Sequence, residues 1–162
     1  MPPTSTWIVS FQCTLAVVIL ALGVSASEPL TSAQEGGSGK KAEKPVYIEY
    51  KGVRIGMDTT EVRTKLGDPA DKGDVQDFFV FSEKESAQVY YTRGKVMAVS
   101  VNYVGDNSGA PLPKAVLGTD VEPKADGAMH KMVRYPAAGY WVSYNRTGGE
   151  DPLVTVTMQK IQ

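Results

Sequence analysis

The chain has 162 residues, 42% of them hydrophobic, which is enough for one ordinary domain with extensions. Its 17 basic and 18 acidic side chains nearly cancel, which leaves a formal net charge of −1. Because a nucleic-acid surface needs a clustered basic excess, this balance argues against a nucleic-acid partner.

The first 26 residues differ in composition from the rest of the chain. They contain no charged side chain, and an apolar run from Leu15 to Val24 leads into the small residues Ser25 and Ala26. This pattern is typical of a secretory signal peptide cleaved after Ala26. The usual positive charges at its start are missing, so an uncleaved membrane anchor is the alternative, although the run is at the lower edge of the ~20 residues that span a bilayer. We expect membrane contact only through this segment, and only if it is not cleaved.

Residues 27–45 are rich in glycine, serine and charged side chains and lack apolar periodicity. They predict a disordered linker before a folded domain at 46–162. Cys13 is the only cysteine and lies within the apolar run, so the mature chain is expected to have neither a thiol nor a disulfide, as suits an oxidising compartment.

The stretch from Gly56 to Pro69 predicts one short helix. Asp58 is suited to cap its first turn, and Glu61 completes a capping box. Val62 and Leu66 are four residues apart and therefore lie on one face. Since a helix of about two turns is not stable alone, this face is expected to pack on the strands that follow.

Four β-branched and aromatic runs predict strands in the first half, at 46–50, 78–81, 88–92 and 96–103. In the last run, Met97, Val99, Val101 and Tyr103 alternate with smaller or polar residues, which indicates one buried face.

The second half repeats this order, with one helical turn at 111–118 and strands at 132–135, 140–145 and 153–158. We therefore expect possible repeats at 46–104 and 105–162. The predicted fold class is α+β, with short helices packed on one face of an antiparallel sheet in two tandem helix–meander units.

The sequence offers no recognisable catalytic or metal-binding pattern. His130 is the only histidine, and it is expected at an exposed strand end rather than in a catalytic site. Asp68, Asp71, Asp74 and Asp77 recur every three residues, but they do not match a calcium loop and are read as solvated turn residues. We expect no cofactor, no metal and no enzymatic activity.

Aromatic residues give the positive signal. In the run at 140–145, Tyr140, Val142 and Tyr144 point to one side of a strand, and Trp141 and Ser143 point to the other. Because the first set is larger and more continuous, we assign it to the core and place Trp141 and Ser143 on an exposed face.

Tyr91 is assigned to the same protein-binding surface as Trp141 and Ser143, since tyrosine and tryptophan are favoured in binding surfaces. The alternative is that both faces of the sheet are core.

Residues 50–103 resemble the BamE (SmpA/OmlA) family of small envelope proteins. The resemblance is carried by Ile55-Gly56-Met57-Asp58, Glu61-Val62, Leu66-Gly67-Asp68-Pro69 and Tyr91-Thr92-Arg93-Gly94-Lys95-Val96. It implies a two-layer α+β fold shared with β-lactamase-inhibitory proteins, which are tandem repeats of such a unit. It also implies a non-catalytic protein that binds other proteins. The lipid-bearing cysteine of that family is lacking here.

These observations lead to a first hypothesis: a non-enzymatic, exported bacterial cell-envelope protein, periplasmic or secreted, that binds a protein partner through its sheet. Outer-membrane assembly or integrity is the process that the resemblance implies. The second hypothesis is an inhibitor of a secreted or periplasmic enzyme that uses the same sheet, and an enzyme comes third.

Export is tested at the predicted cleavage site. We expect the mature chain to begin at Ser27, because small residues end the apolar run and polar sequence starts at once. N-terminal sequencing and intact mass of the exported protein measure this. A chain that still begins at Met1 and sediments with membranes contradicts the prediction and supports the anchor.

Overall fold

The computed structural model describes residues 44–105 and 108–162. The predicted signal peptide at 1–26, its cleavage after Ala26, Cys13 and nearly all of the linker at 27–45 lie outside the described residues. Within the described ranges, no helix has both the length and the apolar character that a bilayer crossing requires. The structure therefore bears on the predicted domain alone.

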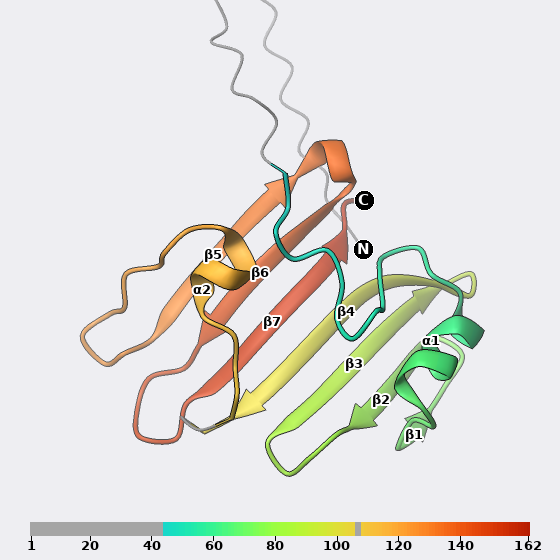
Figure 1. Ribbon diagram of the computed structural model, residues 1–162, viewed down its shortest axis with the longest axis horizontal. Helices are drawn as coiled ribbons and strands as arrows, with labels where there is room; N and C mark the ends of the chain where they lie inside the picture. The colour runs from blue at the N-terminus through green and yellow to red at the C-terminus, as the bar shows by residue number, and fades with distance from the viewer. Residues whose placement is uncertain (1–43, 106–107) are drawn as a thin grey trace, which may run out of the picture. The chain divides into compact units, whose positions relative to one another are not determined.

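Seven antiparallel strands form one continuous sheet (Figure 1). Their bounds are β1 Asp71–Lys72, β2 Gln76–Val80, β3 Glu85–Thr92, β4 Lys95–Val104, β5 Met129–Tyr135, β6 Tyr140–Arg146 and β7 Leu153–Lys160. Their order across the sheet is β1-β2-β3-β4-β7-β6-β5. Two meanders, β1 to β4 and β5 to β7, are thus joined where β4 pairs with β7.

The predicted fold class is wrong in two respects: the sheet outweighs the helices, and the chain does not form two separate helix–meander units. In the described residues the helical elements are short: α1 Thr59–Leu66, α2 Pro113–Leu117 and a 3-10 turn at Pro136–Ala138. A single sheet replaces the two tandem helix–meander units. The two meanders merge because β4 pairs with β7. Without this pairing, β4 and β7 would each leave a row of unpaired backbone groups at the edge of a meander. The content is mixed α and β, but the sheet dominates.

The first predicted strand, at 46–50, is not part of the sheet. Tyr50 bridges only to Val53, across a turn in which Lys51 and Gly52 have φ of 46° and 81°. Tyr50 and Val53 are both buried. The aromatic and β-branched side chains of this run, which favour a strand by composition, therefore pack into the core without forming a strand of the sheet.

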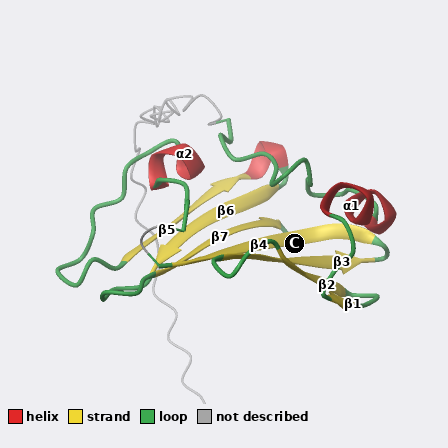
Figure 2. Cartoon of the chain, turned by 60° about the horizontal axis from the view of Figure 1, so that its bottom comes forward, coloured by secondary structure: helices red, strands yellow, loops and turns green. Residues whose placement is uncertain are grey.

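We call residues 44–58 the crossing segment, because they pass over one face of the sheet (Figures 1 and 2). The hydroxyl of Tyr140 in β6 donates to the carbonyl oxygen of Tyr47 at 3.2 Å. The hydroxyl of Tyr50 donates to Glu85 Oε1 in β3 at 2.8 Å. The segment is thus attached to both meanders.

The helix predicted after Gly56 is confirmed as α1. It begins with the predicted capping box, in which the Asp58 backbone N–H donates to Glu61 Oε2 at 3.1 Å. Gly67 ends it with a φ of 86°, a conformation that residues with a Cβ rarely adopt. Val62 is fully buried, whereas Leu66 is only partly buried. The helix therefore docks mainly through Val62.

The two faces of the sheet differ in burial, and buried and half-buried residues alternate along β6 and β7. The covered face lies beneath α1, α2 and the crossing segment (Figure 2). Its buried side chains include Phe79, Val89, Val101, Val142, Val156 and Met158. No described helix lies on the other face, which we call the open face.

The docking of α1 predicts a ranking of two substitutions. Val62→Ala should lower the free energy of unfolding by about 2 kcal/mol, because it removes buried methyl groups and leaves a cavity. Leu66→Ala should cost about half as much, since Leu66 is partly exposed. Urea denaturation of both variants measures the ranking, and the reverse order would show that the helix docks through its last turn instead.

Candidate binding surface

The strand registers define the open face, because residues directly opposite each other on antiparallel strands share a side. A central row runs through Arg134, Trp141, Gln159, Ala98, Tyr90 and Gln76. A second row runs through Met132, Ser143, Thr157, Ser100, Gln88 and Phe78. A third runs through His130, Asn145, Thr155, Asn102, Ser86 and Val80.

The predicted division of β6 between the two faces is confirmed. Tyr140, Val142 and Tyr144 are buried, and Trp141 and Ser143 are half-buried on the open face. Trp141 lies on the second strand from the β5 edge, opposite Gln159 of β7. It is therefore set into the sheet rather than at its margin.

Tyr91 does not share this surface. It is 4% exposed and lies on the covered face, on the same side of β3 as the buried residues Ala87 and Val89. Tyr90 occupies the open face instead. The alternation in the sequence indicates this orientation. Tyr90 alternates in phase with the polar residue Gln88, and Tyr91 alternates in phase with the small apolar residues of the strand.

Neutral polar side chains fill the middle of the open face and bond to one another. The hydroxyl groups of Ser100 and Thr157 are 3.1 Å apart across β4 and β7. Thr155 donates to Asn102 Oδ1 at 2.9 Å between the same strands. In the three rows, the only charged side chain is that of Arg134, at the β5 edge. The surface thus offers aromatic and uncharged polar groups in fixed positions.

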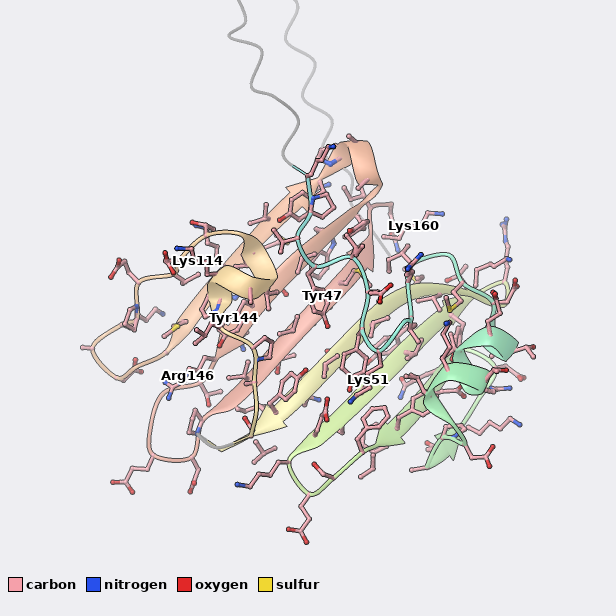
Figure 3. All side chains as sticks on the ribbon, in the orientation of Figure 1. Tyr47, Lys51, Lys114, Tyr144, Arg146 and Lys160 are labelled. Carbon is pink, nitrogen blue, oxygen red and sulfur yellow. The ribbon has the colours of Figure 1, made fainter. Side chains whose placement is uncertain are left out.

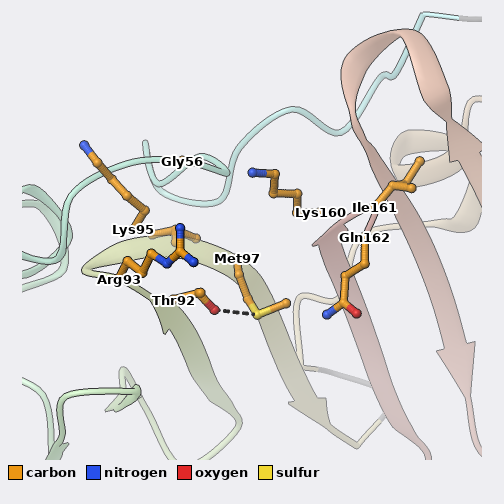
Figure 4. A pocket seen from close by; sticks show the side chains of 9 residues that line it. Gly56, Thr92, Arg93, Lys95, Met97, Lys160, Ile161 and Gln162 are labelled. Carbon is orange, nitrogen blue, oxygen red and sulfur yellow. Dashed lines mark hydrogen bonds between the residues drawn. The ribbon is translucent and has the colours of Figure 1, made fainter.

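One cavity lies on this face, and a second lies at the end of the sheet. The first, which we call the face pocket, has a volume of about 380 Å³ and is lined by Tyr90, Met97, Ala98, Ser100, Thr157 and Gln159. The second, which we call the end cleft, has a volume of about 590 Å³ and lies beyond the paired part of β4 and β7. Its lining includes Arg93, Lys95, Met97 and Lys160 (Figure 4).

A buried carboxylate holds α1 on the covered face. Asp77 of β2 is 0% exposed and accepts hydrogen bonds from both Arg63 Nε and Arg63 Nη2, each at 2.9 Å. The Tyr91 hydroxyl and the Gly73 backbone N–H also donate to it, at 2.8 and 3.2 Å. Both carboxylate oxygens are therefore satisfied, and helix, strand and turn meet at one ion pair.

Two opposing effects act on the pKa of Asp77. Burial raises it, but the hydrogen bonds from Arg63, Tyr91 and Gly73, together with the charge of Arg63, outweigh burial and hold the pKa below its ordinary value of 3.8. The pKa of Tyr91 is raised by burial and by its bond to this carboxylate, so its hydroxyl remains a donor.

A second cluster of polar side chains lies beneath the crossing segment, where Figure 3 labels Tyr47 and Lys51. Glu85 accepts the Tyr50 hydroxyl, and its Oε1 lies 3.4 Å from Lys51 Nζ. Burial and the charge of Glu85 raise the pKa of Tyr103 to about 12. The buried hydroxyl of Tyr47 has no hydrogen-bond partner among the described residues. These tyrosines keep their protons at neutral pH, and their contacts attach the crossing segment to the sheet.

The structure places the residues considered for catalysis or metal binding apart. His130 is exposed on β5. Asp68, Asp71 and Asp74 are exposed, whereas Asp77 is buried against Arg63. In the described part of the chain, no three His, Cys, Asp or Glu side chains gather where they could hold a metal ion.

Comparison with known proteins adds no relative: no family model matches the chain, and neither a curated protein nor a solved structure matches it. The resemblance to BamE proteins stays a prediction.

The ion pair at Asp77 predicts a large loss of stability on truncation. Arg63→Ala leaves a buried, uncompensated carboxylate and should lower the free energy of unfolding by about 3–5 kcal/mol. Arg54→Ala is the matched control, because Arg54 pairs with Glu49 at the surface and such pairs contribute about 0–1 kcal/mol. Chemical denaturation of both variants compares them, and equal losses would contradict the structural role of Asp77.

The lowered pKa of Asp77 predicts a stability loss in acid. Its contribution is complete above the ordinary value of 3.8 and is lost as pH falls through the lower folded-state pKa. Asp77→Asn should therefore flatten the decline in unfolding free energy below about pH 4. Urea denaturation across the acid range measures both slopes; parallel slopes would show that Asp77 has the same pKa folded and unfolded.

Proposed function

We propose that this chain is a non-enzymatic, exported bacterial cell-envelope protein that binds a protein partner through the open face of its sheet. The observation that carries the proposal is the contrast between the two faces. The covered face has its own helices and crossing segment, whereas the open face carries Trp141 among neutral polar rows with no described element packed on it.

The chemistry of the open face supports a protein partner. Aromatic side chains are enriched in the buried centre of interfaces, and charged side chains are depleted there. Trp141, Tyr90 and Phe78 provide the aromatic area, and serine, threonine, asparagine and glutamine rows provide hydrogen-bonding groups that cost less to desolvate than charges.

Export and an envelope location rest on sequence features outside the described residues. The predicted signal peptide and linker favour a domain carried out of the cytoplasm, and the absence of a thiol from the mature chain suits an oxidising compartment. The resemblance to BamE proteins adds the envelope and a protein partner. An inhibitor of a secreted or periplasmic enzyme would use the same face, and the identity of the partner separates the two functions.

Site-specific photocrosslinking in the exporting cell tests the proposal. A photoreactive residue at Ser143 should give one discrete adduct with a partner protein, because Ser143 lies beside Trp141 on the open face. The same probe at Lys114, exposed on α2, is the control and should give none. Adducts from Lys114 alone, or from neither position, would contradict binding through the open face.

Trp141 is the expected anchor. Trp141→Ala should weaken partner binding by about 2 kcal/mol or more, roughly thirtyfold, and should leave the fold nearly as stable, because the side chain lies outside the core. Leu112→Ala, which removes a 74% exposed apolar side chain elsewhere, should leave binding unchanged. Titration of both variants with the partner identified by crosslinking measures the two affinities. Unchanged binding together with a large loss of stability for Trp141→Ala would place Trp141 in the core.

A further inference from the structure

Strand β5 forms one margin of the sheet (Figure 1). It is the last in the strand order, and β6 is the only described strand that pairs with it. Alternate residues of such an edge strand direct their backbone N–H and C=O groups away from the sheet. Within the described part of the chain, the backbone of residues 129–134 forms no backbone hydrogen bond beyond those to β6. The outer edge of β5 is therefore a ladder that another strand can extend.

The opposite margin of the sheet is much shorter. The strand there, β1, has only two residues, whereas β5 has seven. A typical strand of a globular protein has about five or six residues. Of the two margins, β5 alone thus has the length that a full partner strand needs for pairing.

Three side chains of β5 lie on one side of the strand. His130, Met132 and Arg134 are spaced two residues apart and belong to the three rows of the open face. All three are exposed, and Met132, with an exposed fraction of 49%, is a large apolar side chain. A strand added at this edge would place its own alternate side chains directly opposite them. The three side chains therefore face one occupant.

The edge is also positively charged. Arg134 and, on the other side of β5, Lys131 take part in no ion pair within the described residues. No residue of β5 is acidic, and His130 adds a ring N–H donor. Such charges repel unmatched strands, but they attract a strand that brings carboxylates. A second copy of β5 would add like charges and no carboxylate, so the charge of the edge disfavours self-pairing.

We infer that the edge of β5 is a docking site for an extended segment of a partner protein, which adds a strand to the sheet and presents carboxylate, apolar and carboxylate side chains at alternate positions. The apolar side chain lies against Met132, and the carboxylates meet Arg134 and His130. Because this pattern is symmetric about its apolar centre, it fits in either strand direction. The inference goes beyond the proposed function, since backbone pairing at the edge and contact with the open face can each occur without the other.

Synthetic peptides test the inference against the full chain. The probe has a core of aspartate, threonine, leucine, threonine and aspartate. One matched peptide has asparagines in place of the aspartates, and another has the same composition with the two aspartates adjacent. Titration followed by the amide NMR signals of β5 should show at least about fivefold tighter binding of the probe than of either matched peptide, because an exposed ion pair contributes up to about 1 kcal/mol.

N-methylated peptides test the backbone pairing. In an added strand, alternate residues direct their N–H groups toward β5, and the others direct them toward solvent. N-methylation of one alternate set of the probe should therefore abolish binding, and N-methylation of the other set should be tolerated. Hydrogen exchange of β5 amides should slow when the probe binds. Equal tolerance of both sets would show binding by side-chain charge alone and would overturn the inference.

Variants of β5 then assign the side-chain contacts. Arg134→Gln with Lys131→Gln should remove the preference for aspartate over asparagine. Lys72→Gln with Lys84→Gln, an equal loss of charge at exposed positions elsewhere, should preserve it. Met132→Thr should remove the preference for leucine over threonine at the centre of the probe. Thermal unfolding checks the fold of each variant.

Each outcome bears on the inference. Equal affinity of the probe and its matched peptides overturns it, as does a loss of the aspartate preference in the control pair. Concentration-dependent protection of β5 amides without peptide would show a second copy at the edge and also overturns it. Crosslinks at Ser143 without peptide binding would leave the proposed function standing and remove the inference. Protection of β5 by the probe without crosslinks at Ser143 would do the reverse.

Discussion

The structure depends on covering one face of a wide sheet with few and short elements. Seven strands present a broad apolar face, and α1, α2 and the crossing segment together cover it. Each cover is attached by a polar contact from the sheet: Asp77 to Arg63 on α1, Tyr140 to the carbonyl of Tyr47, and the Tyr135 hydroxyl to the carbonyl of Leu117 at 3.5 Å. Because short helices have little stability of their own, these contacts and buried side chains such as Val62 fix where the covers lie.

Local features of this fold were predictable from the sequence, and long-range ones were not. The capped helix at α1, the strands from β2 to β7 and the orientation of Trp141 follow from capping residues and alternation. The joining of the two meanders does not, because a ladder between β4 and β7 depends on pairing between distant segments, which no local pattern encodes. The short strand β1 is too brief to carry a pattern.

Three expectations from the sequence are wrong for physical reasons. The run at 46–50 has strand composition, but the turn at Lys51 and Gly52 folds it back on Val53, so it packs over the sheet. Alternation along the strand predicts that Met97 is buried with Val99, but a β-bulge in the pairing of β3 with β4 moves it to the open face. The sequence predicts that Asp77 is a solvated turn residue, because its partner Arg63 is 14 residues away and no local pattern indicates that the two meet.

The pairing of β4 with β7 has a consequence for the order of folding. The hydroxyl groups that meet across it, on Ser100 and Thr157, are 57 residues apart in the chain. Until β7 is present, β4 is an unpaired edge of the first meander, and such edges are sites of aggregation. Distant pairings also form slowly, because loop closure must come first. Strand β7 therefore completes the sheet, and a chain that lacks it remains open at what becomes the middle of the fold.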